Sequence, residues 1–151
     1  MDTDRIERSI VINALRDRVW QALSSAEEFG TWFGVNLKGQ VFAAGQTVQG
    51  NITHPGYEHL RMTAVIKTVQ PKDLLAFNWH PYAIDPAIDY SHEEQTLVTF
   101  TLSDAPGNAT LLKVVESGFD KVPARRRDEA FRMNSKGWDA QIENIVRHVQ
   151  G

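Results

Sequence analysis

The last third of the chain carries the strongest constraint on the fold. Largely apolar side chains recur there at intervals of 4, 3, 4, 3 and 4 residues: Phe131, Ser135, Trp138, Ile142, Ile145 and Val149. This spacing places them on one face of an α-helix, which we expect over residues 124–149. Gly137 lies inside that pattern at a cost of about 1 kcal/mol relative to alanine. A glycine there predicts a close approach of the helix backbone to a neighbouring element.

The chain between residues 34 and 116 is expected to form strands. Alternating or continuous apolar runs predict strands at 46–54, 59–69, 74–79, 96–103 and 109–116, in addition to an N-terminal strand at 5–13 and a short extended stretch at Val41-Phe42. Turn residues such as Pro55-Gly56 and the run 104–108 separate them. Strands joined by short turns pair mainly antiparallel, and we expect the last two to form a hairpin.

Two short helices are expected after the first strand. Asn13 is placed to cap a helix from about Leu15 to Leu23. Ser25 and Glu28 have the spacing of a capping box, which predicts the start of a second helix carrying Phe29, Trp32 and Phe33. Gly34 is a natural end for that helix.

These elements predict an α+β fold in which residues 1–151 form a single domain. A curved antiparallel sheet of about six to seven strands has one apolar face that needs a cover. Only the C-terminal helix is long enough to provide one. A bent sheet wrapped on a helix favours a cavity between them, and such a cavity is a natural ligand site.

Composition excludes several classes of protein. The chain of 151 residues has no cysteine, which rules out disulfides, thiol catalysis and cysteine-based zinc sites. Its net charge of −3 gives no basic footprint for nucleic acid, and the run Arg125–Arg127 is interpreted as a solvated face. No segment reaches the roughly 20 apolar residues that span a bilayer. The N-terminal Met1–Arg5 is not followed by the apolar region of a secretory signal, so we expect a cytoplasmic protein.

A set of segments, ordered along nearly the whole chain, carries a family resemblance. They are Ile6–Ile12, Val19–Leu23, Trp32-Phe33, Leu74–Trp79, Leu97–Leu102, Ala109–Val114, Glu116–Phe119 and Gly137-Trp138 with the helix that follows. Together they resemble the activators of the heat shock protein 90 ATPase and their bacterial homologues, which belong to the START-like (SRPBCC) superfamily. The resemblance implies the helix-grip fold and a cavity between the long helix and the sheet.

The chain departs from the family pattern in three places. Leu15 follows Ala14 where the family usually has a proline, which affects only a helix start. The acidic loop 80–94 is longer than the resemblance implies, so rim residues in that loop are not carried over. The chain has no room for the separate N-terminal domain of the eukaryotic activators, which weakens the expectation of a chaperone role.

Nine residues are the candidate lining of the cavity. They are Trp32, Phe33, Phe42, His54, Phe77, Trp79, Phe119, Phe131 and Trp138. For the aromatic residues, composition favours a packed core, whereas the resemblance supports a cavity wall. His54 shares the strand parity of Val48 and Ile52, which predicts an inward imidazole near the cavity mouth. The alternative is a histidine at a strand edge or in the core, bonded to a carbonyl.

Catalytic and metal chemistry find weaker support. The loop residues His80, Asp85, Asp89, His92, Glu93 and Glu94 are metal-ligand types, but their spacing matches no known site. A solvated loop or a lid over the cavity is the favoured interpretation. No nucleophile elbow, phosphate loop or dinucleotide motif is present. Glu116 shares the parity of Leu112 and Val114 and would face inward on that count, although exposure at the strand end is the expected outcome.

The sequence therefore predicts a non-catalytic protein that binds a small apolar or aromatic molecule, with no cofactor and no metal. One alternative is a co-chaperone that activates a heat shock protein 90 ATPase. Another is a cyclase-like or hydrolase-like enzyme that uses the cavity. No nucleic-acid or membrane partner is expected, and a homodimer is the default oligomer.

Overall fold

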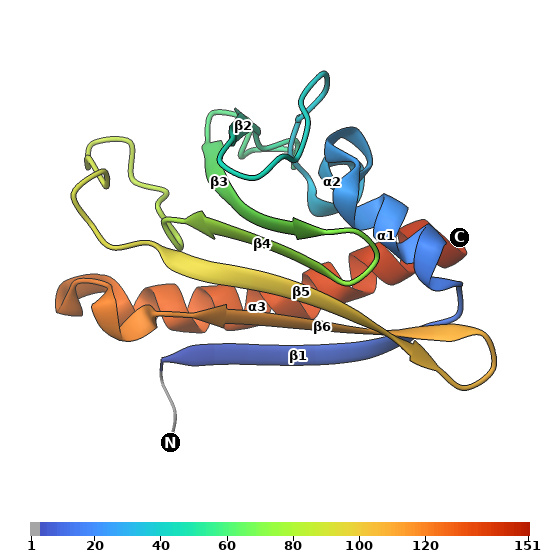
Figure 1. The fold of residues 1–151 in the computed structure, drawn as a ribbon. Helices are drawn as coiled ribbons and strands as arrows, with labels where there is room; N and C mark the ends of the chain where they lie inside the picture. Colours follow the sequence, from blue (N-terminus) through green and yellow to red (C-terminus); the bar gives the residue numbers. More distant parts are fainter. Residues whose placement is uncertain (1–3) are drawn as a thin grey trace.

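The computed structural model describes residues 4–151 and contains one six-stranded sheet, in the order β1-β6-β5-β4-β3-β2, with every neighbouring pair antiparallel (Figure 1). The strands are β1 (Arg5–Ile12), β2 (Thr47–Asn51), β3 (Arg61–Gln70), β4 (Leu74–Trp79), β5 (Thr96–Ala105) and β6 (Ala109–Ser117). The expectation of an absent secretory signal falls partly on Met1–Thr3, which lie outside the described residues.

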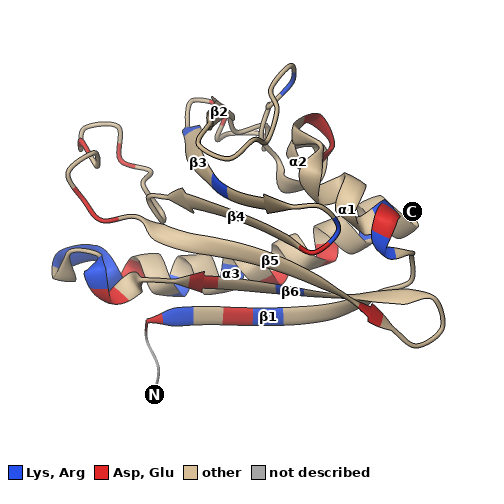
Figure 2. Ribbon diagram, viewed as in Figure 1, with Lys and Arg blue, Asp and Glu red and all other residues tan. Residues whose placement is uncertain are grey.

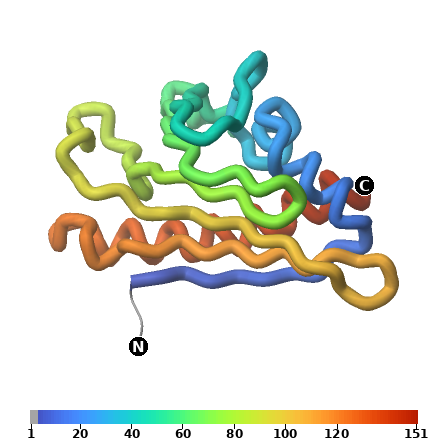
Figure 3. Tube along the Cα trace, viewed as in Figure 1, coloured from blue at the N-terminus to red at the C-terminus, as the bar shows by residue number. Residues whose placement is uncertain are grey.

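A single long helix, α3 (Ala124–Gln150), runs behind the sheet along its length (Figures 1 and 3). The short helices α1 (Arg16–Ser24) and α2 (Ala26–Phe33) follow β1 and pack on each other and on α3, and a 3-10 turn, η1 (Phe119–Lys121), leads into α3. The predicted α+β fold, a curved antiparallel sheet gripping one long helix, is confirmed.

The sheet face toward α3 is set by strict alternation. On β5, Val98, Phe100 and Leu102 are buried, as are Leu112 and Val114 on β6. These strands form the predicted hairpin, with pairs running from Leu97↔Ser117 to Ala105↔Ala109. Because successive strand side chains point to opposite faces, this register brings these five residues to one side, whereas Leu97, Leu111 and Val115 point to the other.

The second short helix begins and ends as its sequence predicts. Ser25 is the N-cap of α2, and its Oγ accepts a hydrogen bond from the Glu28 backbone N–H at 3.3 Å. Gly34 ends the helix with φ of 94°, a left-handed conformation that favours glycine. The predicted cap by Asn13 is wrong, because α1 begins later, at Arg16, with Leu15 as a cap that has no side-chain hydrogen bond. The backbone N–H of Asn13 instead donates to Gln150 Oε1.

Two strand predictions are also corrected. Val41-Phe42 belongs to an irregular connection, and β2 ends at Asn51 rather than at residue 54. Gly50 lies in close contact with the connection after α2, since a Cβ there would lie 1.8 Å from the Asn36 carbonyl oxygen. That connection runs beside the end of β2, where the Asn36 N–H donates to the Asn51 carbonyl and Val35 forms an isolated bridge with Ile52.

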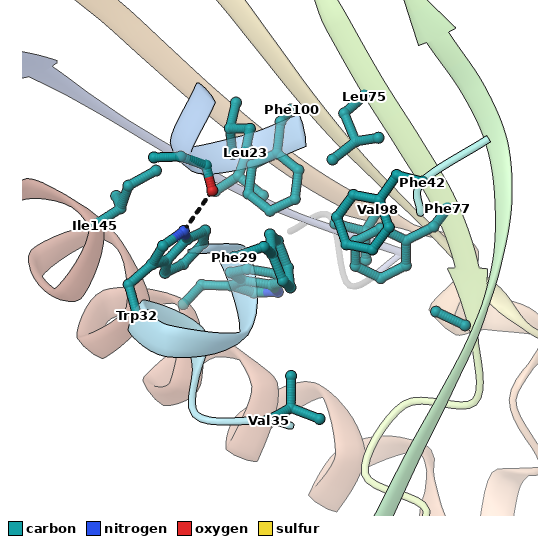
Figure 4. Close-up of a cluster of buried hydrophobic side chains, with 14 of the residues drawn as sticks. Leu23, Phe29, Trp32, Val35, Phe42, Leu75, Phe77, Val98, Phe100 and Ile145 are labelled. Atoms are coloured by element: carbon teal, nitrogen blue, oxygen red, sulfur yellow. Dashed lines mark hydrogen bonds between the residues drawn. The ribbon is translucent and has the colours of Figure 1, made fainter. Parts of the chain in front are cut away.

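An apolar core fills the end of the molecule where α1 and α2 meet the sheet (Figure 4). Phe29 is fully buried at its centre and makes edge-on contacts with Phe42, Phe77 and Phe100. The Trp32 indole N–H donates to the Ala22 carbonyl at 2.8 Å. The buried polar end of this side chain is thus satisfied, as a packed core requires.

Charged residues lie mainly on the sheet face away from α3, on the loops and at the start of α3 (Figure 2). The run Arg125–Arg127 is not simply a solvated face, because the Arg126 side chain is only 13% exposed and pairs with Glu93. Within residues 4–151, no helix combines the length and apolarity needed to span a membrane.

Candidate functional site

A cavity of about 390 Å³ opens between the end of α2, the start of β3, the end of β4 and the loop 80–94. Its lining is mostly apolar and aromatic. The lining residues are Phe33, Ile52, Leu60, Arg61, Met62, Thr63, Trp79, His80, Tyr82, Ala83, Ile84, Tyr90 and Asn134. We call this space the outer cavity.

A second hollow of about 170 Å³ lies against α3 and shares Phe33, Trp79 and Asn134 with the outer cavity. Trp138, Gly137 and Gln141 complete its wall. We call this space the inner cavity. A Cβ added at Gly137 would meet no heavy atom within 4 Å, so the predicted close backbone approach is wrong. The missing side chain of Gly137 instead leaves room in the cavity.

Three aromatic rings form the walls where the two cavities meet. The ring centroids of Phe33 and Trp79 are 6.0 Å apart, those of Phe33 and Trp138 are 6.1 Å apart, and those of Trp79 and Trp138 are 6.1 Å apart. The rings come from α2, β4 and α3, so three separate elements must pack correctly to form this aromatic wall. At these distances the three rings contact one another, so they form one continuous apolar wall against which an aromatic or aliphatic guest can pack.

Behind these walls lies Glu116, whose side chain is fully buried on β6. Four donors converge on its carboxylate. They are Trp79 Nε1 and Thr96 Oγ1, each 2.6 Å from Oε2, and Asn134 Nδ2 and Trp138 Nε1, each 2.9 Å from Oε1. The expected exposure of Glu116 is wrong, and its strand parity with Leu112 and Val114 gave the correct orientation.

Both oxygens of the Glu116 carboxyl group accept hydrogen bonds. An indole N–H can only donate, and each oxygen of Glu116 accepts one from a tryptophan. The remaining two acceptor positions take the Thr96 hydroxyl and the Asn134 amide. Among the described residues, no lysine, arginine or histidine forms an ion pair with this carboxylate. Its burial is therefore offset by hydrogen bonds alone.

The effect of Glu116 on the site is to fix the orientation of its neighbours. Trp79 and Trp138 stand with their N–H edges toward the carboxylate, and their rings are therefore held as walls of the cavities. Glu116 itself does not line either cavity. It acts as a polar anchor behind the wall.

The loop 80–94 is fastened to α3 at its base. Glu93 pairs with Arg126 at 2.7 Å and with Arg125 at 3.0 Å. Arg126 also donates to the Pro81 carbonyl and lies over the Tyr90 ring, 4.8 Å from its centroid. The loop thus forms a wall of the outer cavity. In the part of the chain that the structure describes, its acids and histidines do not gather into a group of three or more that would hold a metal ion.

The nine predicted lining residues divide between cavity and core. Phe33, Trp79 and Trp138 line the cavities. Trp32 borders a third hollow, of about 510 Å³, which shares Phe33 with the two cavities. Phe42, Phe77 and Phe119 are buried in the core, and Phe131 packs edge-on against Phe119 at 5.2 Å. Their side chains fill space between the sheet and the helices and are absent from the walls of the inner and outer cavities.

The inward orientation expected for His54 is wrong. Because β2 ends at Asn51, the parity argument does not extend to residue 54, and the side chain is exposed beside Tyr57. His54 borders the same hollow as Trp32, outside the inner and outer cavities. His54 and Glu116, the two candidates for acid–base chemistry, are therefore not brought together.

Sequence reasoning did not single out Asn134, which lines both cavities and contacts Glu116. A signal was present, because Asn134 stands four residues before Trp138 and so shares its helix face. Gln141 extends that face, and its Nε2 donates to the Phe33 carbonyl at 2.8 Å.

Comparisons with known proteins identify a family and several solved structures that share this fold. The model of a family described as activator of Hsp90 ATPase homolog 1-like protein matches residues 13–150. A search of the curated proteins finds no match. The solution structure of a protein from Arthrobacter aurescens superposes with a TM-score of 0.79 at 16% identity, covering 99% of this chain and 89% of that one.

Two other solved structures share the fold, one of a dimer and one of a longer chain. The Aha1 dimer from Colwellia psychrerythraea superposes with a TM-score of 0.66 at 14% identity, covering 96% of this chain and 95% of that one. DynU16, from the dynemicin biosynthetic locus, superposes with a TM-score of 0.72 at 20% identity, covering 97% of this chain and 47% of that one. The present chain thus spans about half the length of DynU16. At these identities the likeness establishes the fold alone.

Proposed function

The chain belongs to the family of activator of Hsp90 ATPase homolog 1-like proteins, with the helix-grip fold of the SRPBCC superfamily, and from that premise we propose that it binds a small apolar or aromatic molecule. The ligand occupies the outer and inner cavities between α3, α2, the end of β4 and the loop 80–94. The single observation that carries this proposal is the outer cavity of about 390 Å³ with its apolar and aromatic lining.

The size and chemistry of this space support the proposal. Ligand sites in proteins commonly measure about 300–1,000 Å³ and combine an apolar lining with a few placed polar groups. Removing apolar ligand surface from water contributes about 25 cal/mol per Å². The walls are held by the Glu116 hydrogen bonds before any ligand arrives, which reduces the entropy lost on binding.

Native mass spectrometry of gently purified protein tests the proposal. We expect a bound small molecule that is released on denaturation. The matched variants are Gly137→Phe, which fills the inner cavity without removing any hydrogen bond, and Lys136→Phe, which adds the same side chain at an exposed neighbouring position. Gly137→Phe is expected to lower ligand occupancy and Lys136→Phe to leave it unchanged. An apo mass, with no thermal stabilisation by a library of apolar compounds, would contradict the proposal.

A second candidate is activation of a heat shock protein 90 ATPase. Membership of the family and the structural likeness to the Aha1 dimer favour it. It predicts that the chain raises the ATPase rate of such a chaperone and that Gly137→Phe has no effect on this rate. The fold likeness to a dimer also motivates a homodimer, which the same native mass spectra would detect. Either role agrees with the cytoplasmic location expected from the sequence.

A further inference from the structure

The polar atoms around the inner cavity are almost all occupied within the chain. The indole N–H groups of Trp79 and Trp138 donate to Glu116. Gln141 donates through Nε2 to the Phe33 carbonyl and accepts through Oε1 from Asn144. A ligand that enters this space therefore meets apolar ring faces and very few free hydrogen-bonding groups.

The exception is the side-chain oxygen of Asn134. The orientation of this amide is fixed by Glu116. The Asn134 NH₂ group donates to Glu116 Oε1 at 2.9 Å, so Oδ1 points away from that oxygen. Among the described residues, no donor reaches Asn134 Oδ1. It is also not a fully buried atom, since among residues 4–151 Arg126 Nη2, which forms an ion pair with Glu93, is the only buried side-chain nitrogen or oxygen without a hydrogen bond. Asn134 lines both cavities, and Oδ1 is the one side-chain polar atom of this residue that has no hydrogen-bond partner among the described residues.

The carboxyl group behind the wall acts in the same direction. Glu116 is buried, and its oxygens accept from Asn134 and Trp138, so the groups around this part of the wall offer acceptors and no cation. An anionic group placed beside Asn134 would meet an acceptor oxygen and a nearby carboxylate. A neutral hydroxyl or N–H would donate to the acceptor and avoid the repulsion.

We infer that the inner cavity selects neutral aromatic molecules that carry one hydroxyl or N–H donor, with Asn134 Oδ1 as the acceptor and Glu116 as the residue that orients it. The aromatic body packs against the wall formed by Phe33, Trp79 and Trp138. This inference rests on the proposed function, since it specifies the ligand class of the same site.

The experiment compares three probes that differ in one substituent at the same ring position: naphthol, methylnaphthalene and naphthoate. Isothermal titration calorimetry of the full chain gives the dissociation constant of each. We expect naphthol to bind about tenfold more tightly than methylnaphthalene, which corresponds to one hydrogen bond in a desolvated site. Naphthoate is expected to bind most weakly.

Two variants separate a direct contact from general polarity. Asn134→Leu removes the acceptor, and the naphthol preference over methylnaphthalene should disappear. Lys136→Leu places the same side chain at an exposed position of α3 outside both cavities and should retain the preference. The comparison of probes on the unmodified protein stands even if Asn134→Leu fails to fold.

Each outcome has a defined meaning. Equal binding of naphthol and methylnaphthalene would overturn the donor selectivity while leaving an apolar binding protein in place. Tightest binding of naphthoate would also overturn it and would point to the exposed Arg61 at the outer mouth as an anion contact. If none of the three binds, both the proposed function and this inference fail.

Discussion

The two ends of the space between sheet and helix are built from the same elements by different physics. Around Phe29 the space is closed by aromatic rings that meet edge to face (Figure 4). Around Glu116 the Trp79 and Trp138 rings are held by hydrogen bonds to the buried Glu116 carboxyl group, and open cavities remain beside them. The first region shows how apolar packing fills a volume. The second shows how directional hydrogen bonds fix the orientation of aromatic rings beside open space.

Removing the centre of the packed region should have the largest effect on stability. Phe29→Ala deletes a fully buried ring and leaves a cavity among its neighbours, so we expect a loss of about 4 kcal/mol in the free energy of unfolding. Urea denaturation measures this loss. Ligand binding by the folded fraction should also weaken, because the Phe29 ring stacks on Phe33, a wall of both cavities, at 4.9 Å. A loss under about 1 kcal/mol would mean that this end is not the stabilising core.

Changing the anchor of the open region should affect both stability and the site. In Glu116→Gln, the new NH₂ group faces donors and leaves buried N–H groups without an acceptor. We expect a loss of about 3 kcal/mol and a shift in tryptophan fluorescence as Trp79 and Trp138 reorient. Glu94→Gln, an exposed change of the same kind, serves as the control. An unchanged emission spectrum in Glu116→Gln would show that the carboxylate does not orient the indoles.

The polar contacts at the edge of the packed region should matter less. Burial raises the pKa of Glu28, but hydrogen bonds from Arg18 and His148 outweigh it and hold the pKa below its ordinary value of 4.5. A depressed carboxyl pKa stabilises the fold above the unfolded value, and this contribution is lost as the pH falls through the folded value. Glu28→Gln should therefore cost about 1 kcal/mol at neutral pH and nothing in strong acid. Parallel denaturation curves of both proteins across pH 2 to 7 check the sign.

The smallest effect is expected where the open region has room to spare. Gly137→Ala places a methyl group in open space on α3 and should stabilise the helix by up to about 1 kcal/mol. The same methyl group narrows the inner cavity and should weaken ligand binding. Thermal unfolding and calorimetric titration measure the two effects. A variant that is more stable and binds equally well would separate Gly137 from the binding site.

The fold was predictable because its signals are local. The stripe from Phe131 to Val149 placed the long helix, and the strand Leu74–Trp79 has the bounds that its sequence predicts. The end of β2 was not predictable, since residues 51–53 there bond to the segment 34–36, which is distant in the sequence. In the site, Phe33, Trp79 and Trp138 were expected, whereas Phe42, Phe77, Phe119 and Phe131 have the same chemistry but pack elsewhere. Residue type alone does not distinguish a wall from a core.

The sequence by itself determined the elements, their order and the face of each that is buried, because those properties depend on periodicity along the chain. Only the tertiary structure decided what meets on the buried face. The four donors around Glu116 come from positions 18 to 37 residues away in the chain, on β4, β5 and α3. A hydrogen bond requires atoms within about 3 Å at a suitable angle. Sheet register and helix docking set that proximity, and no local pattern encodes it.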